Sequence, residues 1–177
     1  MRVRQTLPEL WLLSDERNDG VLERALRRLP RGSGFIYRHY HLPPGARIAR
    51  WHALLRVARA RGHLAILADS ALTAREWGAD GHYGAPRALY PTRRLVTLAT
   101  AHSLREIAEA NRARADAVLL SPAFPTRSHP GAKALGPLRF RLLAGHAAMP
   151  VIALGGLHPR TAHRLRWHHW AAIDGLS

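Results

Sequence analysis

The chain has 177 residues, no cysteine and a formal net charge of +15 at pH 7. This length fits one domain with a sizeable core, and the lack of cysteine excludes disulfides, thiolate nucleophiles and cysteine-based metal sites. The N-terminus lacks the apolar region of a signal peptide, and no apolar run reaches the roughly 18 residues of a membrane span. We therefore expect a cytoplasmic protein that forms a single domain over residues 1–177 and has no membrane contact.

The positive charge comes almost wholly from arginine, because Lys133 is the only lysine. Such an excess attracts polyanions, which makes nucleic acid a candidate partner. The arginines are spread over the polar faces of helix-like stretches, however, and no known nucleic-acid-binding motif is present. The sequence therefore favours a solvated basic surface and small phosphorylated ligands over nucleic acid.

Short apolar runs alternate with amphipathic stretches along the chain. We expect eight strands at these runs, which read in chain order LWLLSD, GFIYRHY, LAILAD, GADGHYG, LVTLATA, AVLLSP, VIALGG and AAIDGLS. Two of the intervening stretches have a clear helical period. Residues 48–61 place on one face Trp51, Leu54, Leu55 and Ala58, and residues 103–114 place on one face Leu104, Ile107, Ala108 and Asn111.

The repeated order of strand and helix predicts a parallel sheet. Strands that are apolar along their whole length are typical of a sheet covered on both faces, as in a barrel surrounded by helices. An open doubly wound sheet is the alternative, but its GxGxxG turn is missing after the first strand. Eight strands favour a compact (β/α)8 TIM barrel with short helices, the first and last strands side by side, and no helix after the last strand.

In such a barrel, ligands bind at the carboxyl ends of the strands. The candidate site residues are therefore those that end the predicted strands, namely Asp15, Arg38, Asp69, Thr100 with His102, residues 121–129, and Gly155 with Gly156. The segment SPAFPTRSHPGAKALG, residues 121–136, combines hydroxyls, arginine, histidine and glycines, all of which suit phosphate. Each residue alone has a structural alternative, with Asp15 and the pair Asp69-Ser70 as helix caps and the two glycines as a turn.

Twelve histidines raise the question of a metal site. His39 and His41 would share one face of a strand, and His168 and His169 are adjacent. Two ligands do not make a site, however, and no third histidine or carboxylate stands at a fixed spacing. The HExxH and GxSxG motifs are also absent, so we interpret most histidines as surface or packing residues.

The strand ends resemble those of the thiamine phosphate synthase and thiazole tautomerase family of phosphate-binding (β/α)8 barrels. The similarity covers most of the chain, through LWLLSD, ADSALTAREWGADGHYG, TAHSLREIAEANRARADAVLLSPAFPTRSHPGAKALG and PVIALGGLHPRTAHRL. In this family, the loop after the sixth strand and the Gly-Gly after the seventh hold the phosphate of thiazole phosphate. The resemblance implies that the substrate-binding residues are Thr100, Thr126, Ser128, Gly155 and Gly156.

The resemblance also implies a transferase that joins a pyrimidine-methyl pyrophosphate to thiazole phosphate, with Mg²⁺ holding the departing pyrophosphate. Arg38 and His129 would be catalytic, with His129 in the place of a loop lysine. Asp69 would be a metal ligand, but the family's second carboxylate falls on or near Arg87. Mg²⁺ usually binds through one or two carboxylates, so we expect a weak metal site in which arginine takes over the neutralisation of pyrophosphate.

Three alternatives to the synthase stay open. One is a divergent paralogue that binds phosphorylated thiazole or pyrimidine ligands without catalysis. A second is the tautomerase, which has a histidine where this chain has Pro122. The third is a basic barrel that binds RNA. Both a monomer and a homo-oligomer are compatible with the sequence.

Overall fold

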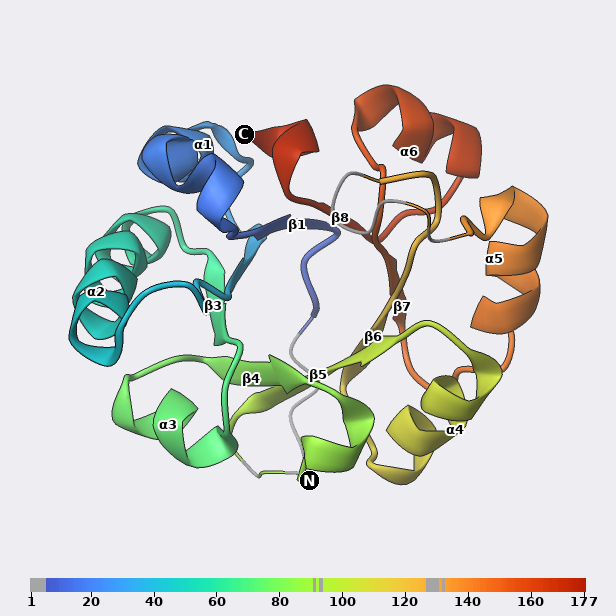
Figure 1. Cartoon of the computed structure of the whole chain (residues 1–177), viewed down its shortest axis with the longest axis horizontal. Coiled ribbons are helices and arrows are strands. Elements are labelled where there is room, and N and C mark those ends of the chain that lie inside the picture. Colours follow the sequence, from blue (N-terminus) through green and yellow to red (C-terminus); the bar gives the residue numbers. More distant parts are fainter. Residues whose placement is uncertain (1–5, 91, 93, 127–130, 132) are drawn as a thin grey trace.

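The computed structural model describes residues 6–90, 92, 94–126, 131 and 133–177. Eight parallel strands form a closed barrel in which neighbours follow chain order and β8 pairs with β1 (Figure 1). The strands are β1 Leu10–Leu13, β2 Gly34–Tyr37, β3 Leu64–Leu67, β4 Gly81–Gly84, β5 Val96–Ala101, β6 Ala117–Leu120, β7 Val151–Ala153 and β8 Trp170–Ala172. The predicted barrel and its closure are therefore confirmed.

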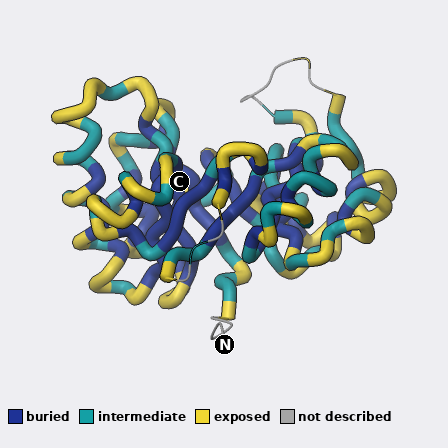
Figure 2. Tube along the Cα trace, turned by 90° about the horizontal axis from the view of Figure 1, so that it is seen from below, coloured by how far each residue is buried: buried dark blue, intermediate teal, exposed yellow. Residues whose placement is uncertain are grey.

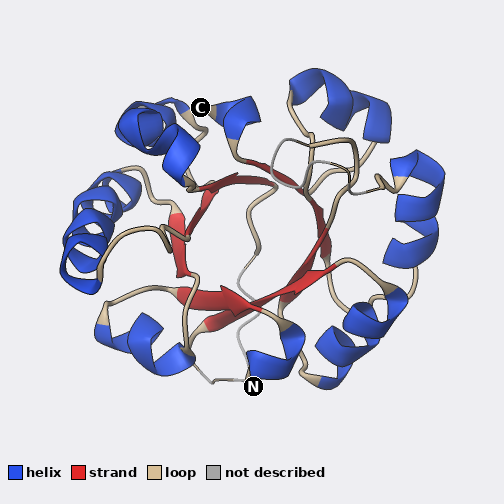
Figure 3. Ribbon diagram, viewed as in Figure 1, coloured by secondary structure: helices blue, strands red, loops and turns tan. Residues whose placement is uncertain are grey.

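Helices connect the strands on the outside of the ring (Figure 3). The α-helices are α1 Leu22–Arg28, α2 Pro44–Ala60, α3 Ala71–Glu76, α4 Leu104–Arg112, α5 Gly136–Ala144 and α6 Pro159–Leu165. The 3-10 helices are η1 Glu16–Val21, η2 Pro86–Ala88 and η3 Asp174–Leu176. No helix in the described part of the chain is long and apolar enough to cross a membrane.

Short elements allow 177 residues to complete the barrel. The three-residue turn η2 is the helical element between β4 and β5, and α3 has only six residues. The final strand ends at Ala172, and η3 follows it, so the predicted strand in AAIDGLS is correct in its first residues and wrong in its last. The expectation that no α-helix follows the last strand agrees with the described chain.

The strands are buried on both faces, which explains their continuous apolar runs (Figure 2). One set of side chains fills the interior of the barrel and includes Trp11, Leu13, Ile36, Ile66, Leu98, Leu119 and Ile152. The side chains at the alternate positions pack outward against the helices. Examples are Leu12, Phe35, Leu67, Val118 and Leu120. This alternation follows from the two-residue period of a strand.

The two helices predicted in detail form, but the buried face of the second differs from the predicted one. All four apolar residues predicted on the face of α2 are buried, from Trp51 to Ala58. In α4, Ile107 is buried as predicted, whereas Leu104 is 49% exposed and Ala108 and Asn111 are only partly buried. Ala110, which the prediction did not include, is buried instead. Leu104 is the first residue after the Ser103 N-cap, and its predicted burial is wrong.

Gly34 makes room for a large side chain inside the barrel. It pairs with Trp11 across β1 and β2, and a Cβ built on Gly34 would overlap the Trp11 ring. That ring cannot easily move, because its Nε1 donates a hydrogen bond to the Pro8 carbonyl at 2.7 Å and its side chain is fully buried. The absence of a side chain at Gly34 is thus a packing requirement.

We expect Gly34→Ala to lower the free energy of unfolding by about 1–3 kcal/mol, because the added methyl group overpacks the interior. Gly45→Ala is the matched control, since nothing lies within 4 Å of a Cβ at that position in the first turn of α2. The control should leave stability unchanged or slightly raised. Urea denaturation measures both, and equal stability of the two variants would contradict this account of the interior.

Candidate functional site

The carboxyl ends of the eight parallel strands meet at one rim of the barrel, because all the strands run in one direction around a closed ring. Arg38 directly follows β2, Asp69 lies two residues after β3, and Thr100 is in the last part of β5. Gly155 and Gly156 follow β7, and Thr126 follows β6. Ser128 and His129 lie outside the described residues.

Arg38 is fixed by contacts to the end of β1. Its backbone N–H donates to Ser14 Oγ at 2.8 Å, and its Nη2 donates to Asp15 Oδ2 at 2.6 Å. Burial raises the pKa of Asp15, but hydrogen bonds from Arg17 and the charges of Arg17 and Arg38 lower it overall, so this carboxylate stays ionised. The Arg38 Nε is buried without an acceptor among the described residues. A desolvated guanidinium N–H of this kind is suited to an anionic ligand.

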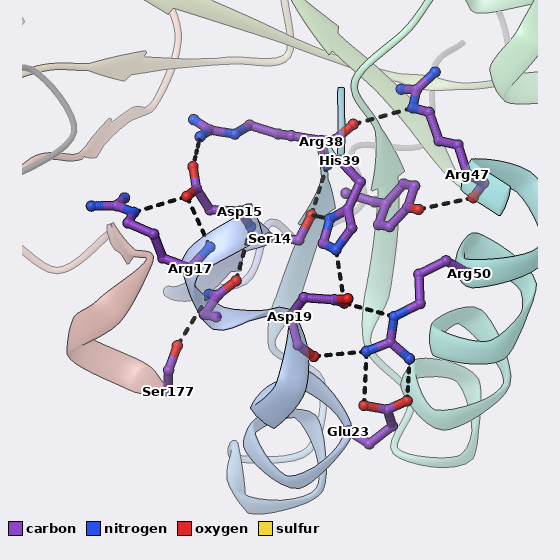
Figure 4. A network of polar contacts seen from close by, with 12 residues as sticks. Ser14, Asp15, Arg17, Asp19, Glu23, Arg38, His39, Arg47, Arg50 and Ser177 are labelled. Carbon is purple, nitrogen blue, oxygen red and sulfur yellow. Dashed lines mark hydrogen bonds and ion pairs between the residues drawn. The ribbon is translucent and has the colours of Figure 1, made fainter. Parts of the chain in front are cut away.

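A buried histidine supports the same strand end, as Figure 4 shows. The His39 side chain is fully buried, with Nδ1 2.8 Å from Ser14 Oγ and Nε2 2.8 Å from Asp19 Oδ1. His39 has a φ of 38°, so it has already left the strand, and the prediction that it shares a strand face with His41 is wrong. The two rings do lie close, with centroids 4.9 Å apart.

The contacts of His39 define its tautomer when it is neutral. Ser14 Oγ accepts the Arg38 N–H and therefore has its own proton for His39 Nδ1. Since the Asp19 carboxylate can only accept, the ring proton is on Nε2. Asp19 is held in turn by Arg50, whose Nε donates to Oδ1 at 2.7 Å. This chain of hydrogen bonds fixes the backbone from which Arg38 extends.

Asp69 is engaged by Arg47, which comes from the first turn of α2. Arg47 Nη1 donates to Asp69 Oδ2 at 2.6 Å, and Asp69 Oδ1 accepts the Ser70 N–H at 2.8 Å. Burial raises the pKa of Asp69, but the hydrogen bonds from Arg47 and Ser70 lower it overall. Sequence reasoning missed Arg47, because nothing in the local pattern distinguishes it from the other arginines on helix surfaces. The structural alternative for Asp69-Ser70, a helix cap, is also present, since the Ser70 hydroxyl caps α3.

The residues around Asp69 do not fit a Mg²⁺ site. Arg87, at the expected position of a second carboxylate, donates from Nε and Nη2 to Glu109 Oε1 at 3.0 and 2.8 Å. Over the described residues, no group of three or more histidine, aspartate or glutamate side chains is placed to hold a metal ion. Asp69 is thus a single carboxylate that is already ion-paired with Arg47, and this does not match the oxygen-rich ligand set of a hard cation.

Thr100 contacts a residue that the sequence did not single out. Tyr83, from β4, is buried inside the barrel, and burial raises its pKa, although the side chain of Thr100 acts to lower it. Next to Thr100, His102 Nδ1 lies 3.0 Å from the Ser121 carbonyl and 3.1 Å from Ser121 Oγ. Polar groups from β4, β5 and β6 are thus linked at the rim. Only side-chain contacts in three dimensions identify Tyr83, because its sequence segment reads as an ordinary apolar strand.

The loop after β6 lies against the Gly-Gly turn after β7. Phe124 N donates to the Gly155 carbonyl at 3.0 Å, and both glycines have positive φ, 99° at Gly155 and 62° at Gly156. A Cβ on Gly155 would lie 2.7 Å from Pro122 Cα, and one on Gly156 would overlap the Pro125 carbonyl. Glycine is therefore required at both positions by backbone conformation and by close approach. The half-buried Thr126 continues this loop.

We expect His39→Asn to reduce the loss of stability on acidification. Burial lowers the pKa of His39, although Asp19 acts to raise it, so the folded protein resists the proton that the unfolded chain takes up near pH 6.5. The stability of the folded state is therefore fully present above about pH 6.5 and falls as the pH drops below it. Asparagine tolerates the positive φ and removes the titration.

Thermal unfolding between pH 8 and pH 5 tests this expectation. The exposed His52 provides the control, and His52→Asn should keep the pH profile of the parent. His63 and His82 also have pKa values lowered by burial, so the profile of His39→Asn should flatten but not become level. Superimposable profiles of the parent and His39→Asn would contradict the role given to His39.

The chain as a whole matches a known family in sequence and in fold. A thiamine-phosphate synthase from Chlorobium luteolum is 32% identical over 180 residues, which cover 96% of this chain and 84% of the relative. Thiamine phosphate pyrophosphorylase from Pyrococcus furiosus superimposes with a TM-score of 0.79 at 23% identity, over 97% of this chain and 88% of the other. The corresponding enzyme from Bacteroides thetaiotaomicron gives a TM-score of 0.57 at 14% identity, over 94% and 82%.

The sequence identity of these two structures to this chain is low, so they support the fold alone. The sequence itself carries the assignment, since residues 10–175 match the family described as thiamine monophosphate synthase. That range extends from the first strand to the turn after the last one. The resemblance noted at the strand ends is confirmed, and the chain belongs to the thiamine monophosphate synthase family.

Proposed function

We propose that this chain is a thiamine phosphate synthase-like transferase, which joins a pyrimidine-methyl diphosphate to thiazole phosphate and releases diphosphate in thiamine biosynthesis. The observation that carries the proposal is Arg38. Its Nη2 is held by Asp15, while its Nε is buried without an acceptor among the described residues. An arginine in this state gains a charge-assisted hydrogen bond when an anion binds. Family membership over residues 10–175 supports the same reaction.

The reaction breaks the C–O bond between the pyrimidine methylene and the diphosphate. The electron pair of that bond leaves with the diphosphate, and the thiazole nitrogen supplies the pair for the new C–N bond. Negative charge therefore grows on the leaving oxygen. We assign its stabilisation to Arg38, whose position is fixed before the substrate arrives by Ser14 and Asp15.

The thiazole phosphate is assigned to the loop after β6 and the turn after β7. The contact between Phe124 and Gly155 supports this assignment, because it brings the segment that leads to Thr126 against the two glycines. Thr100 is proposed as a further substrate contact. Ser128 and His129 are assigned by the resemblance alone, with Ser128 as a hydroxyl donor and His129 as a positive group beside the phosphates.

Mg²⁺ is the cofactor expected from the family, in which it neutralises the diphosphate. Because the residues around Asp69 do not fit the ion, no step of the proposed reaction is assigned to it. The proposed partners are the two phosphorylated precursors. The cytoplasm is the proposed location, since an enzyme of this kind acts on small charged molecules.

We expect the purified protein to form thiamine phosphate from both precursors, and Arg38→Ala to lower kcat by about 10²–10³-fold, the usual effect of removing one donor to a developing oxyanion. Arg112→Ala is the matched control, because it removes the same charge from an exposed residue at the far end of α4. The control should keep the parent rate. Absence of product from the folded parent, with and without Mg²⁺, would contradict the proposed reaction.

We expect Thr126→Ala combined with Ser128→Ala to weaken thiazole phosphate binding at least tenfold. Each charge-assisted hydrogen bond contributes on the order of 1.5–3 kcal/mol, and one such loss already exceeds a factor of ten. The melting temperature should stay nearly unchanged, since Thr126 is not part of the core. Titration calorimetry checks the affinity, and a double variant that binds like the parent would show that the loop does not hold the phosphate.

A divergent binding protein without turnover is the second candidate. It is favoured by the ion pair of Asp69 with Arg47, because the carboxylate expected to bind the metal is already paired. The same assay separates the candidates. Binding of thiazole phosphate without any product, under conditions in which both precursors saturate the protein, would favour the binding protein.

A further inference from the structure

We propose that the guanidinium of Arg47 is a built-in cation of the rim, which occupies the oxygen cluster at Asp69 and makes diphosphate binding independent of a divalent metal ion. The part of this inference that concerns diphosphate rests on the proposed function. The part that concerns the metal ion rests on the geometry of Arg47 alone.

Arg47 is surrounded by the kind of ligands that a hard cation selects. Its Nη1 donates to Asp69 Oδ2 at 2.6 Å, its Nη2 to the Ala68 carbonyl at 3.0 Å, and its Nε to the Arg38 carbonyl at 3.2 Å. One carboxylate and two carbonyl oxygens thus converge on a single positive group. Oxygen atoms of these two types are also the ligands of Mg²⁺ and Mn²⁺ in proteins. The guanidinium already satisfies them.

The guanidinium is held in place from its faces as well as from its edges. Its central carbon lies 5.5 Å from the centre of the Tyr40 ring and 5.4 Å from that of the Trp77 ring, and both contacts favour a cation. The backbone of Arg47 is fixed too, because Tyr37 Oη donates to the Arg47 carbonyl at 2.8 Å. The Arg47 side chain is only 12% exposed. The positive charge is therefore part of the folded structure.

A divalent ion would have to displace this group to reach Asp69. The ion pair would be broken, and the displaced guanidinium would remain nearby and repel the ion. The second oxygen of Asp69 accepts the Ser70 N–H, and an ion bound to it would still lie close to the Arg47 guanidinium on the same carboxylate. Arginine keeps its charge at every accessible pH, so neither pH nor a chelator removes this cation.

The same arrangement presents donors to an anion. Arginine carries five N–H donors, and Arg47 uses three of them in contacts with the described residues. Arg38, whose carbonyl binds Arg47, adds a buried Nε without an acceptor in the described chain. The rim therefore carries two guanidinium groups, that of Arg38 at the end of β1 beside Asp15 and that of Arg47 beside Asp69 after β3. A free diphosphate, with charge on both phosphoryl groups, is the class of ligand that matches two such groups.

The first experiment measures metal and diphosphate binding directly. Inorganic pyrophosphate is titrated into the protein by calorimetry, once with EDTA and once with saturating Mg²⁺, and Mn²⁺ alone is titrated by electron paramagnetic resonance. We expect Kd values for pyrophosphate that agree within about threefold between the two conditions, and no Mn²⁺ binding tighter than about 1 mM. Pyrophosphate binding that is at least tenfold tighter with Mg²⁺, or absent from both titrations, would overturn the inference. So would tight Mn²⁺ binding that Asp69→Asn removes.

The second experiment tests Arg47 itself. Arg47→Ala should weaken pyrophosphate binding at least tenfold in EDTA, whereas Arg112→Ala, which removes an exposed arginine at the far end of α4, should not. An Arg47→Ala variant that folds and binds pyrophosphate like the parent would overturn the role of Arg47. If this variant does not fold, the titrations of the parent protein still decide.

The results also separate this inference from the proposed function. Thiamine phosphate formation that requires Mg²⁺ would leave the proposed function intact and refute the built-in cation. Metal-independent pyrophosphate binding by a protein that forms no thiamine phosphate would do the reverse.

Discussion

The pairing of β1 with β8, from Leu10 opposite Trp170 to Leu12 opposite Ala172, closes the sheet into a ring. It is supported at the carboxyl end by Asn18, whose Nδ2 donates to the Leu13 carbonyl at 3.0 Å and to the Ile173 carbonyl at 3.3 Å. Without closure, the ends of the strands would spread along an open edge. With it, residues that are far apart in the chain share one rim, and every contact described at the candidate site depends on that geometry.

Closure with few residues places demands on the rim. The connections are short, so neighbouring strand ends are held together by side chains that reach across them. Arg47 joins the ends of β2 and β3, and Ser14 joins the ends of β1 and β2. The chain has only 12 acidic residues, and at the rim Asp15 pairs with Arg38 while Asp69 pairs with Arg47. The carboxylates there are thus used to fix arginines, which gives part of the large positive charge a structural role.

The sequence was sufficient for the strands because their signal is local. A strand covered on both faces is apolar at most positions, so eight such runs predict eight strands and their parallel order. The face of α2 was predicted for the same reason. The predicted burial of Leu104 was wrong, because the helical period identifies a face but not which turns of that face are covered by the rest of the protein.

The candidate site was less accessible to sequence reasoning. Strand ends identified Arg38, Asp69 and Thr100, because in a barrel their position alone brings them to the rim. Arg47 and Tyr83 reach the rim from a helix and from the barrel interior, and no local pattern reports such contacts. The positive φ of His39 was likewise invisible, since it is a non-glycine residue in a conformation that only its surroundings stabilise.

A guanidinium in the place of a metal ion changes what the rim can do. A metal ion arrives with its hydration shell and must lose water to bind diphosphate, whereas Arg47 is already desolvated and oriented by the protein. Electrostatic stabilisation is most effective when the stabilising charge needs no reorganisation as the reaction proceeds. The cost is lower charge, since one guanidinium carries half the charge of Mg²⁺. Arg38 is a second arginine at the same rim, and its buried Nε has no acceptor in the described chain. In the proposed arrangement, the two guanidinium groups together carry the same formal charge as one Mg²⁺ ion.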